Sequence, residues 1–123
     1  MINVIGFDHV VLNVEDVERS LAFYCEELGL KPERVEEWRD KKVFFPSVRI
    51  DERTLIDLLQ VPRTGENANH ICLVVDPADF DALKASGRFE VVDGPDVRWG
   101  AQGDATSLYV KDPDGNVVEL RYY

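Results

Sequence analysis

The segment DHVVLNV, residues 8–14, resembles the segment NHICLVV, residues 69–75, in its hydrophobic pattern and in the place of its histidine. Each segment has the β-branched, apolar character of a strand, and acidic residues that begin a helical pattern follow it. His9 and His70 lie 61 positions apart. Self-similarity at a fixed distance is typical of a duplicated structural unit.

A second match lies near the end of each half of the chain. TLIDLL, residues 54–59, resembles NVVELR, residues 116–121, so Asp57 and Glu119 take equivalent places 62 positions apart. Two matches at nearly the same spacing predict two copies of one unit. The interpretation is a single domain of residues 1–123, with module 1 at about 1–62 and module 2 at about 68–123.

Both copies are predicted to have the element order βαβββ. In the first copy the predicted strands cover residues 7–14, 31–38, 42–48 and 54–60, and a helix capped by Asp16 covers residues 17–28. In the second copy the predicted strands cover residues 70–75, 89–92, 107–110 and 117–122, and a helix capped by Asp76 covers residues 78–86. Residues 93–104 are expected to form a long loop and residues 112–116 a tight turn. The predicted fold class is α+β, with two tandem βαβββ modules forming a curved mixed sheet around a central groove.

The composition is that of a folded protein, with 123 residues, 45% hydrophobic and 31% charged. A net charge of −10 repels phosphate backbones and anionic lipids, which predicts neither a nucleic-acid nor a membrane partner. Cys25 and Cys72 lie in apolar segments without CxxC spacing, and we expect free thiols. The sequence opens without a signal-peptide pattern and has no membrane-spanning apolar run, so a cytoplasmic location is predicted.

The repeated histidines and acids are candidate metal ligands. Residues two apart share a face of a strand, so His9, His70, Glu119 and Asp57 can all lie on the concave face of the sheet. A carboxylate in an apolar strand is costly unless it is paired or coordinates a cation. Two imidazoles with one or two carboxylates suit zinc, nickel, iron(II), manganese or cobalt. Whether Asp57 is a ligand stays open, because its side chain is one methylene shorter than that of glutamate and reaches less far toward the ion.

A structural interpretation competes with the metal site. A histidine on a strand is most often an ordinary satisfied residue. Glu119 and Asp57 could instead form salt bridges with Arg121 and Arg53. The two histidines and the two carboxylates each repeat at nearly the same spacing, and this agreement favours the metal interpretation.

The runs FDHVVLNVEDVERSLAFYCEELGL, NHICLVV and DPDGNVVELRYY resemble the vicinal oxygen chelate superfamily. That group includes glyoxalase I, methylmalonyl-CoA epimerase, type I extradiol dioxygenases, fosfomycin-resistance thiol transferases and bleomycin-resistance proteins. The resemblance implies that His9, His70 and Glu119 bind a divalent metal ion and that Asp57 matches the fourth ligand position. It also implies a homodimer and chelation of vicinal oxygens on a small-molecule substrate.

Several features narrow the reaction. The chain has no third histidine for a dioxygenase, and Val11 stands where fosfomycin enzymes have threonine. Ser107 and Tyr109 do resemble positions of the fosfomycin class. Bleomycin-binding members of the superfamily typically lack the three metal ligands, so the presence of His9, His70 and Glu119 argues against that class. The favoured prediction is a metal-dependent lyase or isomerase of the glyoxalase I type, acting through an enediolate-like intermediate. A non-catalytic, antibiotic-type binding and resistance protein and a fosfomycin-type thiol transferase stay open.

In the favoured interpretation Glu119 or Asp57 moves the proton next to the substrate carbonyl. Six further side chains are candidates for a substrate pocket: Asn13, Trp38, Arg98, Trp99, Ser107 and Tyr109. The aromatic members can equally be core or loop residues. Arg98 could meet an anionic substrate or simply be a solvated loop arginine.

Overall fold

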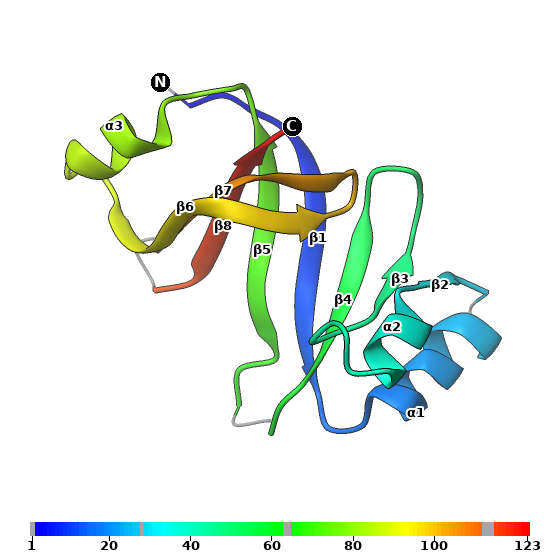
Figure 1. Cartoon of the computed structure of the whole chain (residues 1–123). Helices are drawn as coiled ribbons and strands as arrows, with labels where there is room; N and C mark the ends of the chain where they lie inside the picture. The colour runs from blue at the N-terminus through cyan, green and yellow to red at the C-terminus, as the bar shows by residue number, and fades with distance from the viewer. Residues whose placement is uncertain (1, 28, 63–64, 112–114) are drawn as a thin grey trace. The chain divides into compact units, whose positions relative to one another are not determined.

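The computed structural model describes residues 2–27, 29–62, 65–111 and 115–123, and Figure 1 shows their helices and strands. The chain divides into two compact units. The N-terminal unit is His9–Asn69, and the C-terminal unit is His70–Tyr123 together with Met1–Asp8. Strand β1 (Val4–Val14) contributes its first residues to the C-terminal unit and the rest to the N-terminal unit.

Four strands form the sheet of the N-terminal unit: β1, β2 (Lys31–Glu33), β3 (Ser47–Arg49) and β4 (Leu55–Gln60). Their order is β2-β3-β4-β1, with β1 and β4 parallel and the other pairs antiparallel. The helices are α1 (Val17–Leu21), which continues as a π-helix η1 (Ala22–Glu27), and α2 (Val35–Arg39). The core of this unit consists of Val17, Leu21, Val48 and Leu58.

Two predictions for this unit were wrong and one was confirmed only in part. The segment predicted as a strand at 31–38 forms only the three-residue β2, and α2 follows it. Val35 and Trp38, three positions apart on α2, both pack against the core, which is helical spacing rather than strand alternation. The strand predicted at 42–48 is limited to β3. The predicted helix at 17–28 is present as α1 and η1, and its last residue lies outside the described residues.

Strands β5 (Ala68–Val75), β8 (Val117–Tyr122), β7 (Gly103–Lys111) and β6 (Glu90–Gly100) lie in that order, with β5 and β8 parallel. In the C-terminal unit the chain just before β1 lies beside the end of β5, where the Asp76 amide donates to the Asn3 carbonyl at 3.0 Å. Helix α3 (Phe80–Ala85) packs through Phe80 on Val75, Leu108, Val110 and Leu120.

The long loop predicted at 93–104 was wrong, because these residues form a β-hairpin (Figure 1). β6 runs to Gly100 and pairs with β7 from Gly103 onward. The three glycines of this segment lie at an irregularity of the hairpin, in the case of Gly94, and at its turn, in the case of Gly100 and Gly103. Gly94 has φ 86° at a register shift, and a Cβ there would lie 2.6 Å from the Ser107 carbonyl oxygen.

The predicted cap of the second helix was also wrong. Asp79, not Asp76, caps α3, because its Oδ1 accepts a hydrogen bond from the Ala82 amide at 3.0 Å. The turn predicted at 112–116 falls mainly on residues 112–114, which lie outside the described residues. The α+β class with two tandem modules is confirmed. Among the described residues, no helix is long and apolar enough to cross a membrane.

Candidate functional site

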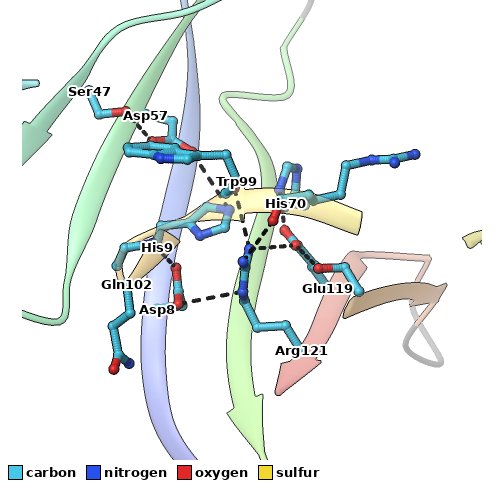
Figure 2. A network of polar contacts seen from close by, with 12 residues as sticks. Asp8, His9, Ser47, Asp57, His70, Trp99, Gln102, Glu119 and Arg121 are labelled. Atoms are coloured by element: carbon cyan, nitrogen blue, oxygen red, sulfur yellow. Dashed lines mark hydrogen bonds and ion pairs between the residues drawn. The ribbon is translucent and has the colours of Figure 1, made fainter. Parts of the chain in front are cut away.

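The N-terminal unit brings His9 of β1 and Asp57 of β4 together (Figure 2). In the strand register Asp57 lies beside Val11 on one side and Ser47 on the other. The Ser47 hydroxyl donates to Asp57 Oδ1 at 2.5 Å, and Asp57 Oδ2 lies 3.6 Å from His9 Nε2. Both side chains are almost fully buried, with 3% of His9 and 1% of Asp57 exposed. One carboxylate oxygen therefore faces a serine and the other a histidine.

The C-terminal unit contains a second arrangement of the same kind. The Ser107 hydroxyl of β7 donates to Glu119 Oε1 at 2.7 Å, and Glu119 Oε2 lies 3.1 Å from His70 Nε2. Glu119 is buried on β8, whereas the His70 side chain is 12% exposed. Tyr109 lies opposite Glu119 in the strand register, and its ring meets the His70 ring edge-on at 5.3 Å.

The duplication thus extends to a third polar position: Ser107 was predicted as a pocket residue, but its counterpart Ser47 and the match between the two serines were not predicted. Ser47 and Ser107 lie 60 positions apart, nearly the spacing of the histidines and of the carboxylates. In each unit a serine contacts one oxygen of a carboxylate, and the other oxygen of that carboxylate faces a histidine. The signal was present in the sequence, since Ser47 stands ten residues before Asp57 and Ser107 twelve before Glu119.

The nitrogen–oxygen distance of each carboxylate–histidine pair is compatible with two ligands of one divalent ion, and at His70–Glu119 it is also a hydrogen-bond distance. Two ligands that each lie about 2.1 Å from one ion are separated by roughly 3.0 to 3.5 Å. The nitrogen–oxygen distances of 3.1 Å at His70–Glu119 and 3.6 Å at His9–Asp57 are close to this separation. The serine on the far oxygen of each acid is the type of outer contact that orients a metal ligand.

Arg121 of β8 adds a buried cation beside Glu119. Its Nη1 donates to Glu119 Oε1 at 3.2 Å, and its Nε lies 3.7 Å from Asp8 Oδ2 (Figure 2). The salt bridge between Glu119 and Arg121, the structural alternative to a metal site, is therefore present. Glu119 makes this salt bridge and the His70 contact at the same time. Asp8, which the sequence analysis did not single out, also accepts hydrogen bonds from the Ala101 amide and the Tyr123 hydroxyl.

These charges shift the pKa values of their neighbours. Burial, and then the charge of Glu119, raises the pKa of Tyr109. Burial, and then the hydrogen bond to Asp8, raises the pKa of Tyr123. Burial opposes the charge on Arg121, but the fields of Tyr123, Asp8 and Glu119 outweigh it and raise the guanidinium pKa.

An alkaline titration checks these shifts. The folded state favours the neutral phenols of Tyr109 and Tyr123, so their stabilising contribution is complete below the unfolded pKa of about 10 and is lost as the pH rises further. We expect part of the tyrosinate absorbance of the folded protein to appear at higher pH than in the urea-unfolded chain. Tyr109→Phe should remove part of this delayed component, and an unchanged titration curve would contradict the assignment.

The six pocket candidates lie in different surroundings. Ser107 and Tyr109 lie at the His70–Glu119 pair, and the Trp99 carbonyl on β6 accepts from Arg121 at 3.3 Å. Trp38 packs in the core of the N-terminal unit. Asn13 lines a cavity of about 380 Å³ beside the start of α1.

Arg98 lies in β6 and not in the predicted loop. Its guanidinium pairs with Asp93 and Asp96 at 3.0 Å each, and all three side chains are at least one-third exposed. Arg98 thus lies in a solvent-exposed cluster of ion pairs, in agreement with the prediction of a solvated arginine.

Comparisons with known proteins give a consistent result. The family model "Glyoxalase/Bleomycin resistance protein/Dioxygenase superfamily" matches residues 6–120. Lactoylglutathione lyase of Salmonella typhimurium is 32% identical over 91% of this chain and 88% of its own. A glyoxalase domain-containing protein of Mycosarcoma maydis is 31% identical over 99% of this chain and 70% of its own. The Mn(II)-bound glyoxalase from Novosphingobium aromaticivorans has the same fold, with a TM-score of 0.72 and 24% identity; the match covers 99% of this chain and 40% of that one.

Proposed function

Because the chain belongs to the Glyoxalase/Bleomycin resistance protein/Dioxygenase superfamily, we propose that it is a divalent-metal-dependent lyase or isomerase of the glyoxalase I type. The proposed substrate is a small molecule with vicinal oxygens, and the proposed assembly is a homodimer. The relative named lactoylglutathione lyase supports a lyase over a protein that only binds its ligand.

The observation that carries the proposal is the duplicated set of serine, carboxylate and histidine, one in each unit. We propose that His9, His70 and Glu119 hold the ion and that Asp57 is either a fourth ligand or the proton carrier. Two imidazoles and one or two carboxylates accept zinc, nickel, iron(II), manganese or cobalt. When bound, such an ion supplies Lewis-acid polarisation of a substrate carbonyl.

The residues of the chain divide the remaining work. Glu119 is held by Ser107 and Arg121 on one oxygen and faces His70 with the other, so it is suited to stay in place as a ligand. Asp57 faces His9 at the longer distance of 3.6 Å. Of its two proposed roles, we favour the proton step for Asp57: its carboxylate takes the proton from the carbon next to the carbonyl and returns it to the carbonyl carbon. Ser47 keeps the opposite oxygen of Asp57 fixed during this transfer.

Metal loading and turnover test the proposal. The untagged full chain is stripped, titrated with Mn(II), Ni(II) or Zn(II), and assayed with the hemithioacetal of methylglyoxal and glutathione. We expect stoichiometric uptake and metal-dependent turnover, and loss of both in His9→Ala. The matched control is Arg88→Gln, which changes an exposed residue. A chain that takes up no divalent ion would overturn the proposal, and uptake without turnover of this or other vicinal-oxygen substrates would favour a binding protein.

A further inference from the structure

Arg121 is the largest fully buried side chain among the described residues. A buried guanidinium is costly unless its donors are satisfied. Here Nη2 donates to the carbonyls of Arg98 at 2.9 Å and Gly103 at 3.0 Å, one on each strand of the β6–β7 hairpin. The side chain therefore links β8 to both strands of that hairpin.

The hairpin is also shaped to admit this guanidinium. A Cβ at Gly100 would lie 2.3 Å from Arg121 Nη1 and 2.4 Å from its Cζ. Real side chains do not approach so closely, so glycine at position 100 leaves the space that the guanidinium fills. On the other side Arg121 lies over the ring of Tyr123, with its Cζ 4.9 Å from the ring centroid.

The same guanidinium controls one oxygen of Glu119. Oε1 accepts from Ser107 at 2.7 Å and from Arg121 Nη1 at 3.2 Å. Oε2 is thereby left facing His70 Nε2 at 3.1 Å. Two donors on Oε1 favour this orientation of the carboxylate, in which Oε2 is the oxygen on the histidine side.

We propose that Arg121 is a positioning residue that fixes Glu119 as a ligand through one oxygen and so sets the affinity and coordination number of the metal site. This inference rests on the proposed function, because Glu119 is a metal ligand only there. The requirement is for a guanidinium, since the planar fork can donate to Glu119, Arg98 and Gly103 at once. A lysine would keep the charge but not this set of contacts.

Cobalt(II) is the probe for this role, because its visible absorption reports coordination. We expect Arg121→Lys to raise the dissociation constant for cobalt(II) about 10- to 100-fold, the usual effect of losing an outer contact to a metal ligand. The absorption intensity should change as well, since a freed Glu119 can offer both oxygens. Arg88→Lys, the matched arginine control on the exposed surface, should bind and absorb like wild type. Circular dichroism of the metal-free proteins verifies that each variant is folded.

A second variant keeps the inference testable if Arg121→Lys does not fold. Gly100→Ala retains the guanidinium but displaces it, and it should produce the same weaker binding and altered spectrum. Either folded variant with the wild-type dissociation constant and spectrum would overturn the role of Arg121 while leaving the metal site standing. Wild-type protein that takes up no cobalt(II) would overturn the proposed function, and the role of Arg121 with it.

Discussion

Glu119→Gln is expected to lower kcat/KM for the hemithioacetal by about 10³-fold or more, on the scale of losing a ligand or an acid–base group. Glutamine keeps the size of the side chain, but its neutral oxygen is a weaker ligand for a divalent ion. The amide also cannot satisfy Ser107, Arg121 and His70 as the carboxylate does, because one of its two ends is a donor. Kinetics and elemental analysis on the same preparation separate a loss of metal from a loss of turnover.

Two further variants serve as comparisons for Glu119→Gln. Glu90→Gln removes an exposed glutamate of β6 that pairs with Lys111 at 3.5 Å, and it should leave kcat/KM unchanged. Asp57→Asn should retain metal and lose turnover if Asp57 carries the proton. Full turnover with bound metal in Glu119→Gln would show that this carboxylate is not a ligand, and the proposed site would then be wrong.

Arg121→Met is expected to lower the free energy of unfolding of the metal-free protein by about 3–5 kcal/mol, the usual cost of breaking a buried ion pair from one side. Methionine fills much of the space but leaves Asp8 and Glu119 buried without this cation. Urea unfolding at neutral pH measures the loss. Arg98→Met is the matched control, because the exposed pairs of Arg98 predict a change of about 1 kcal/mol or less.

A double variant tests the physical reason for that loss. Adding Asp8→Asn to Arg121→Met removes one of the two buried charges, so the double variant should be more stable than the sum of the two single losses predicts. Strict additivity would indicate that Arg121 stabilises by packing and hydrogen bonds to the hairpin, and not by its charge.

The repeat in the sequence predicted the fold class, and the resemblance of three runs of residues predicted the family. The structure shows that each histidine lies beside the carboxylate of its own copy, a pairing that the sequence analysis did not predict. Strand β8 has the predicted bounds, because alternating apolar residues define it without ambiguity. The convergence of both histidines with Glu119 on one ion stays a prediction, and cobalt(II) titration of His9→Ala and His70→Ala bears on it directly.

The sequence did not predict the hairpin or the contacts that it makes possible. Gly94 and Pro95 fall in the segment predicted as a loop, and only the β7 register shows that they lie at an irregularity in a continuing strand. The hydrogen bonds that join Asp8 to Ala101 and Tyr123 span 93 and 115 positions. No local pattern reports on such distant partners, so the surroundings of Arg121 could not be read from the residues beside it.

The space at position 100 also constrains how this chain could have evolved. An alanine Cβ at position 100 would lie 2.3 Å from Arg121 Nη1, so alanine there requires the guanidinium to move from its present place. This placement of the guanidinium therefore favours glycine at position 100. Homologous sequences with arginine at the second position after the terminal-strand glutamate should therefore carry glycine at the hairpin position as a linked pair.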